Sequence, residues 1–161
     1  MNDNNNIGIL LQPDRVMICH DIRSKKRLLE KISEILAGAE PGLTEMDVRD
    51  CLLKRERLGS TGLGHGVAMP HGRIAGIDRS LACFVKLTPP VDYDAADGEP
   101  VDLVMAILMP ESCSDTDLRL LPQLSQQLGD RNLCERLRRI QREELLFNAL
   151  QPSRPQAIVN E

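Results

Sequence analysis

The spacing of apolar residues along the chain switches between a helical and an extended pattern. Apolar residues recur every three to four positions in some stretches and run almost without interruption in others, which separates amphipathic helices from buried strands. Ser24 and Thr44 stand where helix N-caps belong, and Gly38, Gly59 and Gly129 stand where helices should stop. We expect helices over residues 24–38, 44–58, 115–128, 132–140 and 143–150, and strands over 16–19, 66–69, 81–87 and 101–109.

Two details refine this picture. The stretch Val101–Met109 is almost continuously apolar, as a central strand covered on both faces would be. Pro122 falls inside the helix expected over 115–128 and predicts a kink or a later true start. Strands and helices alternate without a strict repeat, so the predicted fold class is α/β, with a small mixed β-sheet flanked by helices.

The chain has 161 residues, which suits a single domain over 1–161. We expect its core over about residues 7–150. The Asn-rich start, and the tail from Gln151 with its two prolines, are expected to be disordered.

Composition excludes several classes of function. The net charge of −4 gives no general attraction to nucleic acid or anionic lipid, and 2% aromatic residues leave little for a base-stacking surface. Five scattered cysteines without a C-x-x-C pair are typical of a reducing compartment. The start of the chain lacks an apolar signal region, and no apolar run reaches the length of a membrane span. The prediction is a cytoplasmic protein without membrane insertion.

The segment Arg55–Arg73 carries the candidate chemistry and reads RERLGSTGLGHGVAMPHGR. Its five glycines between residues 59 and 72 exclude a regular helix. Pro70 fixes the direction of the chain before His71, and Gly72 removes side-chain bulk after it. This arrangement predicts an imidazole at a strand end with one face open, as a nucleophilic histidine requires. A hydrogen-bonded structural histidine is the competing interpretation, and spacing alone divides the two about evenly.

A phosphoryl group received by His71 would need hydrogen-bond donors around it. Arg55 offers a planar fork of N–H groups, and Arg73 is a second candidate. Ser60, Thr61 and the glycine-rich backbone offer hydroxyl and amide donors, although both could be turn residues only. Arg55 could equally be an exposed residue of a last helical turn, and Glu56 an ion-pair partner or a solvated residue. This chemistry requires neither a metal nor a cofactor.

The same glycines do not match either of two other known phosphate-binding motifs. Gly59 and Gly64 have P-loop spacing, but His65 and Gly66 follow where Lys and Ser or Thr are required. A dinucleotide-binding fingerprint fails because Val67 stands at its third glycine. His65 lacks partners at metal-ligand spacing, so we expect it in a loop at the rim of the site.

The long segment resembles the signature of the fructose/mannitol-type enzyme IIA family of the phosphoenolpyruvate-dependent phosphotransferase system, and most of all its nitrogen-regulatory branch. The resemblance extends to SKKRLLEKISEIL, PVDLVMAILMP and LCERLRRIQREELLFNAL, and so covers most of the chain. It implies that His71 accepts the phosphoryl group, on Nε2, and that Arg55 contacts it. It also implies a donor, a small histidine phosphocarrier of the HPr type, and regulatory targets such as potassium transporters or sensor kinases.

One position departs from the family pattern. Family members usually carry a second histidine near the start of the helix after the central strand, and Asp117 stands at the matching place. Its carboxylate could repel a phosphoryl group on His71 or hold the tautomer of the ring. It could also complete a capping box with Ser114.

The prediction is therefore a stoichiometric phosphohistidine carrier, a phosphotransferase component whose phosphorylation state regulates nitrogen metabolism or potassium transport. Two alternatives remain within the same fold. One is a binding protein that has lost phosphorylation, for which Asp117 is the motive. The other is the sugar-specific enzyme IIA component of a fructose or mannitol transporter. A small-molecule phosphate or nucleotide binder is a third class, against which the missing P-loop lysine counts.

Overall fold

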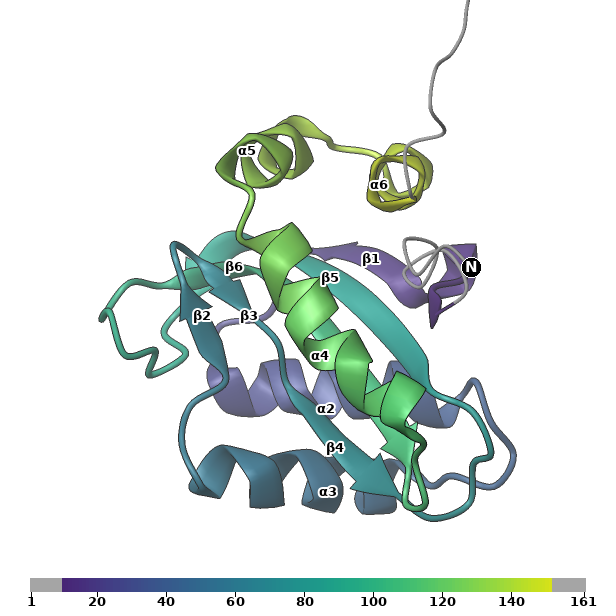
Figure 1. The fold of residues 1–161 in the computed structure, drawn as a ribbon. Helices are drawn as coiled ribbons and strands as arrows, with labels where there is room; N and C mark the ends of the chain where they lie inside the picture. Colours follow the sequence, from purple (N-terminus) through teal and green to yellow (C-terminus); the bar gives the residue numbers. More distant parts are fainter. Residues whose placement is uncertain (1–9, 152–161) are drawn as a thin grey trace, which may run out of the picture.

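Helices cover both faces of one mixed β-sheet in the computed structural model, which describes residues 10–151 (Figure 1). Helices α2 (Lys25–Ala37) and α3 (Glu45–Arg57) lie on one face. Helix α4 (Asp115–Leu128) crosses the other face, together with α5 (Arg131–Arg139) and α6 (Glu143–Leu150). A short 3-10 turn, η2 (Pro13–Arg15), leads into the first strand. The predicted α/β class with a mixed sheet flanked by helices is confirmed.

The sheet is built around its two longest strands, β5 (Leu81–Val91) and β6 (Val101–Pro110), which pair antiparallel. Strand β1 (Val16–Cys19) runs parallel to β5 at one edge. On the other side of β6, β3 (Val67–Ala68) and β4 (His71–Ile74) pair parallel to it one after the other. Strand β2 (Gly62–Gly64) pairs antiparallel with β3.

Helix ends follow the capping residues that the sequence suggested. The side chain of Ser24 accepts from the backbone N–H of Arg27 at 3.1 Å, and Thr44 accepts from Asp47 at 3.1 Å. Asp130, which the sequence analysis did not name, caps α5, and this helix begins at Arg131 instead of the expected residue 132. These bonds satisfy N–H groups that the first helical turn leaves without a partner, and they fix where α2, α3 and α5 begin.

Two apolar layers hold the helices to the sheet. One lies under α2 and α3 and includes Leu28, Ile32 and Leu52; the other lies under α4 to α6 and includes Phe84, Leu124 and Leu146. Strand β6 is buried along nearly its whole length, as its continuous apolar run predicted. Leucine, isoleucine, valine and methionine make up most of both layers, consistent with the scarcity of aromatic residues.

The structure corrects several predicted boundaries. Before Pro70 the expected strand over 66–69 is only the two-residue β3, and β4 follows directly after Pro70, so His71 begins a strand instead of following one. Strand β5 continues beyond residue 87 to Val91, which pairs with Val101. Strand β2 was not expected at all.

Helix α4 begins at Asp115 and contains Pro122 in its interior, so a later start is wrong. The expectations for residues 1–9 and 152–161 concern positions outside the described range.

Candidate functional site

His71 stands at the break between β3 and β4, where the chain is held on both sides. The carbonyl of Pro70 accepts from the N–H of Ile107 on β6 at 3.0 Å. The N–H of Met69 donates to the carbonyl of Thr61 at 3.0 Å. Because Pro70 has no N–H and a fixed φ, these two bonds leave the segment little freedom. The backbone that carries the imidazole of His71 is therefore rigid.

The ring of His71 is held by one hydrogen bond that decides its tautomer. Its Nδ1 lies 2.8 Å from the carbonyl oxygen of Met69. A carbonyl can only accept, so Nδ1 carries the proton and Nε2 keeps its lone pair. Burial lowers the pKa of His71 and the neighbouring charge of Arg55 lowers it further, while the Met69 bond and Glu56 oppose the shift. At neutral pH the ring is neutral, with an unprotonated Nε2.

This imidazole opens into a cavity of about 820 Å³ between α3, β4 and α4. Leu58 at the end of α3 is 82% exposed and Leu118 on α4 is 40% exposed, and both line it. Its charged lining residues are Asp47, Asp50, Lys54, Arg55, Arg73 and Glu111. The site is thus a charged pocket around a half-buried histidine, bordered by exposed leucines.

Arg55 comes from the last turn of α3 and lines the same cavity. One guanidinium nitrogen, Nη1, donates to the carbonyl of Gly59 at 3.0 Å. Within residues 10–151 no carboxylate lies within ion-pair distance of Arg55, so the rest of its N–H fork remains available for an anion.

Gly72 and Arg73 also line this cavity. A Cβ on Gly72 would lie 2.5 Å from Sγ of Cys51 on α3. The glycine is therefore required for α3 to approach β4 closely, and this approach brings Arg55 to the side of His71. Arg73 is exposed.

Ser60 and Thr61 have other roles in the structure. The Ser60 hydroxyl accepts from the N–H of Gly62 at 3.2 Å, within the turn that enters β2. Thr61 is 5% exposed, and its hydroxyl contacts Glu56 and the hydroxyl of Tyr93. Neither residue lines the cavity around His71.

His65 lies in the turn between β2 and β3, with a left-handed φ of 56°. Its ring accepts from Nη2 of Arg131, which lies 2.8 Å from Nε2. It lines a different cavity of about 460 Å³ near α5, so the structure does not place it at the rim of the His71 pocket.

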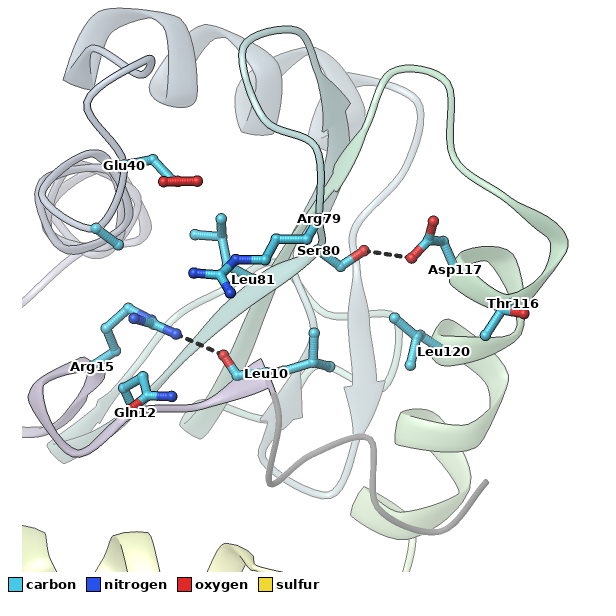
Figure 2. A pocket seen from close by; sticks show the side chains of 11 residues that line it. Leu10, Gln12, Arg15, Glu40, Arg79, Ser80, Leu81, Thr116, Asp117 and Leu120 are labelled. Atoms are coloured by element: carbon cyan, nitrogen blue, oxygen red, sulfur yellow. Dashed lines mark hydrogen bonds between the residues drawn. The ribbon is translucent and has the colours of Figure 1, made fainter. Parts of the chain in front are cut away.

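Asp117 does not line the His71 cavity but another cavity of about 300 Å³, which it shares with Arg15 and Arg79 (Figure 2). One carboxylate oxygen accepts from the hydroxyl of Ser80 at 3.0 Å. The other accepts from the N–H of Ser114 at 3.0 Å and completes a capping box. These bonds lower the pKa of Asp117. The capping interpretation accounts for its contacts, and on α4 it is Leu118 and Leu121 that line the His71 cavity.

Sequence reasoning did not find the buried network behind Arg55. The side chain of Glu56 is 5% exposed, and its carboxylate forms an ion pair with Lys25 at 2.9 Å. It also accepts from the N–H of Thr61 at 3.2 Å. Of the two interpretations of Glu56, the ion-pair partner is the one the structure shows, with Lys25 as the partner. The rest of the network was not predicted, because nothing in the local sequence shows that Tyr93 reaches Thr61 from 32 residues away.

Within the described residues, no group of three or more His, Cys, Asp or Glu side chains could hold a metal ion. None of the helices in that range is long and apolar enough to cross a membrane.

Comparison with known proteins shows which family the chain belongs to. The family model "Phosphoenolpyruvate-dependent sugar phosphotransferase system, EIIA 2" matches residues 9–152. The "Nitrogen regulatory protein" of Klebsiella oxytoca is 42% identical over 129 residues, 80% of this chain and 79% of that protein. Its counterpart in Pseudomonas aeruginosa is 38% identical over 138 residues, 86% of this chain and 90% of that protein.

Solved structures give the same picture. Nitrogen regulatory protein IIA-Ntr from Neisseria meningitidis superposes with a TM-score of 0.85 at 36% identity, over 91% of this chain and 99% of that one. IIA mannitol from Escherichia coli has a TM-score of 0.69 at 21% identity, over 87% and 98%, and shares the fold. The suspected resemblance is confirmed, and the chain belongs to the EIIA 2 family of the phosphoenolpyruvate-dependent sugar phosphotransferase system.

Proposed function

We propose that this protein is a phosphohistidine carrier that receives a phosphoryl group on Nε2 of His71 and regulates other proteins through its phosphorylation state. The observation that carries the proposal is the hydrogen bond from Nδ1 of His71 to the carbonyl of Met69 at 2.8 Å. It leaves Nε2 with a lone pair at a cavity that Arg55 also lines. This is the arrangement that attack on phosphorus requires.

The chemical step needs no group beyond the two proteins. The lone pair of Nε2 forms a bond to phosphorus while the P–N bond to the donor histidine breaks, and the donor nitrogen recovers that electron pair. Nδ1 keeps its proton throughout. Positive charge grows on the His71 ring, and the phosphoryl oxygens carry spread negative charge that the guanidinium of Arg55 can stabilise.

The surface around the pocket supports a protein donor. Leu58 and Leu118 expose apolar side chains beside His71, as expected where a protein partner excludes water from the reacting atoms. The proposed donor is an HPr-like histidine phosphocarrier, itself phosphorylated from phosphoenolpyruvate, and the carrier would work in the cytoplasm with it.

Phosphorylation adds close to two negative charges at this rim, which is sufficient to break or create a protein contact. We assign the output to regulatory partners in nitrogen metabolism or potassium transport, such as potassium transporters or sensor kinases. The relatives named nitrogen regulatory proteins, at 38% and 42% identity, support this assignment.

Intact-protein mass after incubation with phosphoenolpyruvate, enzyme I and the HPr-like carrier tests the proposal. The wild-type protein should gain one acid-labile phosphoryl group and His71→Ala none. A wild-type protein that stays unlabelled under conditions that label a known enzyme IIA would refute the carrier function.

The same assay distinguishes the alternatives. A binding protein that has lost phosphorylation would stay unlabelled, and Asp117→His would then gain the label. The placement of Asp117 in a capping box favours the carrier, because its carboxylate is directed toward Ser80. A sugar-specific component would pass the label to a transporter domain IIB, which adding such a domain to the labelled protein would reveal.

A further inference from the structure

Glu56 is a buried carboxylate directly beside Arg55, and its contacts are unusually complete. Lys25 forms an ion pair with it at 2.9 Å, and the N–H of Thr61 donates to it at 3.2 Å. The hydroxyl of Thr61 also donates to it, since a carboxylate can only accept. That hydroxyl in turn accepts from the hydroxyl of Tyr93 at 2.9 Å.

A buried charge needs such partners, because an ion removed from water is costly unless it is paired and hydrogen-bonded. Lys25 is also held in place, with Nζ 4.3 Å from the centre of the Tyr93 ring. Burial and the charge of Glu56 raise the pKa of Tyr93, so its hydroxyl keeps its proton and remains a donor. The four side chains form one network, which we call the Glu56 network: Lys25, Glu56, Thr61 and Tyr93.

The Glu56 network is connected to His71 by two backbone hydrogen bonds. The carbonyl of Thr61 accepts from the N–H of Met69 at 3.0 Å. The carbonyl of Met69 accepts from Nδ1 of His71 at 2.8 Å. Glu56 holds the backbone of Thr61, and the two bonds hold the carbonyl of Met69 at the ring. The N–H and the carbonyl of each of these residues belong to different peptide groups, so the negative charge of Glu56 acts on the ring through space. A catalytic triad places a carboxylate directly on the histidine, and here the carboxylate acts from behind the backbone.

We propose that Glu56 is a positioning residue that acts on His71 through Thr61 and Met69, fixing its tautomer and stabilising the positive charge that grows on the ring during phosphoryl transfer. The inference rests on the carrier function proposed above and deepens it. It also gives a reason for a buried carboxylate at position 56, since Glu56 does not line the cavity that Arg55 and His71 share.

The effect of the Glu56 charge on His71 can be distinguished from the effects of the other charged residues near the ring. The charged residues that face His71 are Arg55, Asp47, Asp50 and Lys54 from α3, Arg73 from β4 and Glu111 after β6, whereas α4 contributes Leu118 and Leu121. Glu45 is an exposed carboxylate on the same helix as Glu56, outside both the network and the lining of the His71 cavity. Glu45→Gln therefore makes the same substitution as Glu56→Gln at a control position.

The first measurement is the pKa of His71 from the ring signals of the unphosphorylated protein in an NMR titration. Loss of a nearby negative charge disfavours the imidazolium, so Glu56→Gln should lower this pKa by at least about half a unit. Lys25→Met removes the neutralising cation and should raise it. Glu45→Gln should shift it by less than about 0.2 units, because solvent screens an exposed charge.

Opposite shifts in Glu56→Gln and Lys25→Met would not arise from general loosening of the fold, which would move both variants the same way. If Glu56→Gln does not fold, an upward shift in Lys25→Met supports the proposal only when its amide NMR spectrum outside the Glu56 network matches that of the wild type, which excludes general loosening. Equal shifts in Glu56→Gln and Glu45→Gln, or no upward shift in Lys25→Met, would overturn the proposal.

The second measurement is the single-turnover rate of phosphoryl acceptance from the HPr-like donor. Glu56→Gln should lower the maximal rate about tenfold and leave the donor concentration for half-maximal rate unchanged, as outer-shell partners of functional histidines do. If the wild-type protein accepts no phosphoryl group, the carrier function is refuted, but the NMR titration still tests the effect of Glu56 on His71. Failure of the carrier function can therefore be distinguished from failure of the positioning role. A normal maximal rate in Glu56→Gln would overturn the positioning role.

Discussion

The glycine-rich segment contains the dipeptide His-Gly twice, at His65-Gly66 and His71-Gly72, and the structure treats the two copies differently. His71 is half-buried, and its Nδ1 donates to the carbonyl of Met69. His65 is exposed in a hairpin turn, and its Nε2 accepts from the guanidinium of Arg131 at 2.8 Å. One ring meets an acceptor and the other a donor.

This difference decides what each imidazole can do. An acceptor at Nδ1 leaves the opposite nitrogen with a lone pair for attack, and it stabilises the charge that attack creates. A guanidinium donor occupies the lone pair itself and opposes any positive charge on the ring. The residue type and its glycine neighbour therefore do not by themselves predict a nucleophile; the hydrogen-bond partner of the second ring nitrogen is also needed.

The largest expected effect is on labelling by the donor. His71→Gln should abolish phosphoryl acceptance, because no other described side chain offers an unprotonated ring nitrogen at the Arg55 cavity. His65→Gln should accept at a rate within about twofold of the wild type. Intact-protein mass over time measures both, and a loss of labelling in folded His65→Gln would contradict the comparison.

The next largest effect is the difference in acceptance rate between variants of the two arginines beside these histidines. Arg55→Ala should lower the rate of acceptance by about a hundredfold, the usual cost of removing a group that stabilises transition-state charge. Arg131→Ala should change it less than about twofold, since Arg131 lines the other cavity. Similar rates for the two variants would show that Arg55 does not contact the phosphoryl group.

Substitution of the glycines that follow the two histidines, Gly66 and Gly72, should lower the free energy of unfolding by different amounts. Gly66 has a φ of 82°, and a Cβ there would lie 2.5 Å from Nη2 of Arg138, so Gly66→Ala should cost about 3 kcal/mol of unfolding free energy. Gly72→Ala meets only Sγ of Cys51 and should cost about 1.5 kcal/mol.

Denaturant unfolding measures both glycine variants. Adding Cys51→Ala should recover part of the loss in Gly72→Ala and nothing in Gly66→Ala. Additive losses for the Gly72 and Cys51 pair would remove the steric explanation.

The smallest effect concerns pH. The pKa of His71 lies below its ordinary value of 6.5, so more than half of the rings stay neutral at pH 6.5 and protonation stops the reaction only below it. The rate of acceptance should fall less than about twofold between pH 8 and pH 6.5, and steeply at lower pH. Single-turnover rates, corrected with a second acceptor for the donor's own titration, test this. A midpoint above 6.5 would mean that burial does not dominate at His71.

The sequence predicted the parts of the site that depend on neighbours in the chain. Arg55, His71 and Gly72 line one cavity because the segment that joins them is short and its glycines allow a sharp return. The α/β class and the helix caps at Ser24 and Thr44 follow from local patterns for the same reason. The catalytic and binding roles of these residues stay predictions until phosphoryl transfer is measured.

The parts that the sequence did not predict depend on contacts between distant segments. Tyr93, which contacts Thr61, follows β5 closely, and β5 continues to Val91 instead of ending at the expected residue 87. The direction of Asp117 depends on a single position along α4, since neighbouring helical residues point about 100° apart. Leu118 therefore lines the His71 cavity, and Asp117 lines the other one.

The order of the strands has a consequence for synthesis of the chain. Strands β1, β3 and β4 all pair with β5 or β6, which occupy residues 81–110. On the ribosome, every strand before residue 81 must wait for a partner, apart from the small β2–β3 hairpin. The sheet then closes late and in one cooperative step, from contacts between residues far apart in the chain. A truncated chain that ends before β6 would expose its apolar strands and be a target for chaperones and proteases.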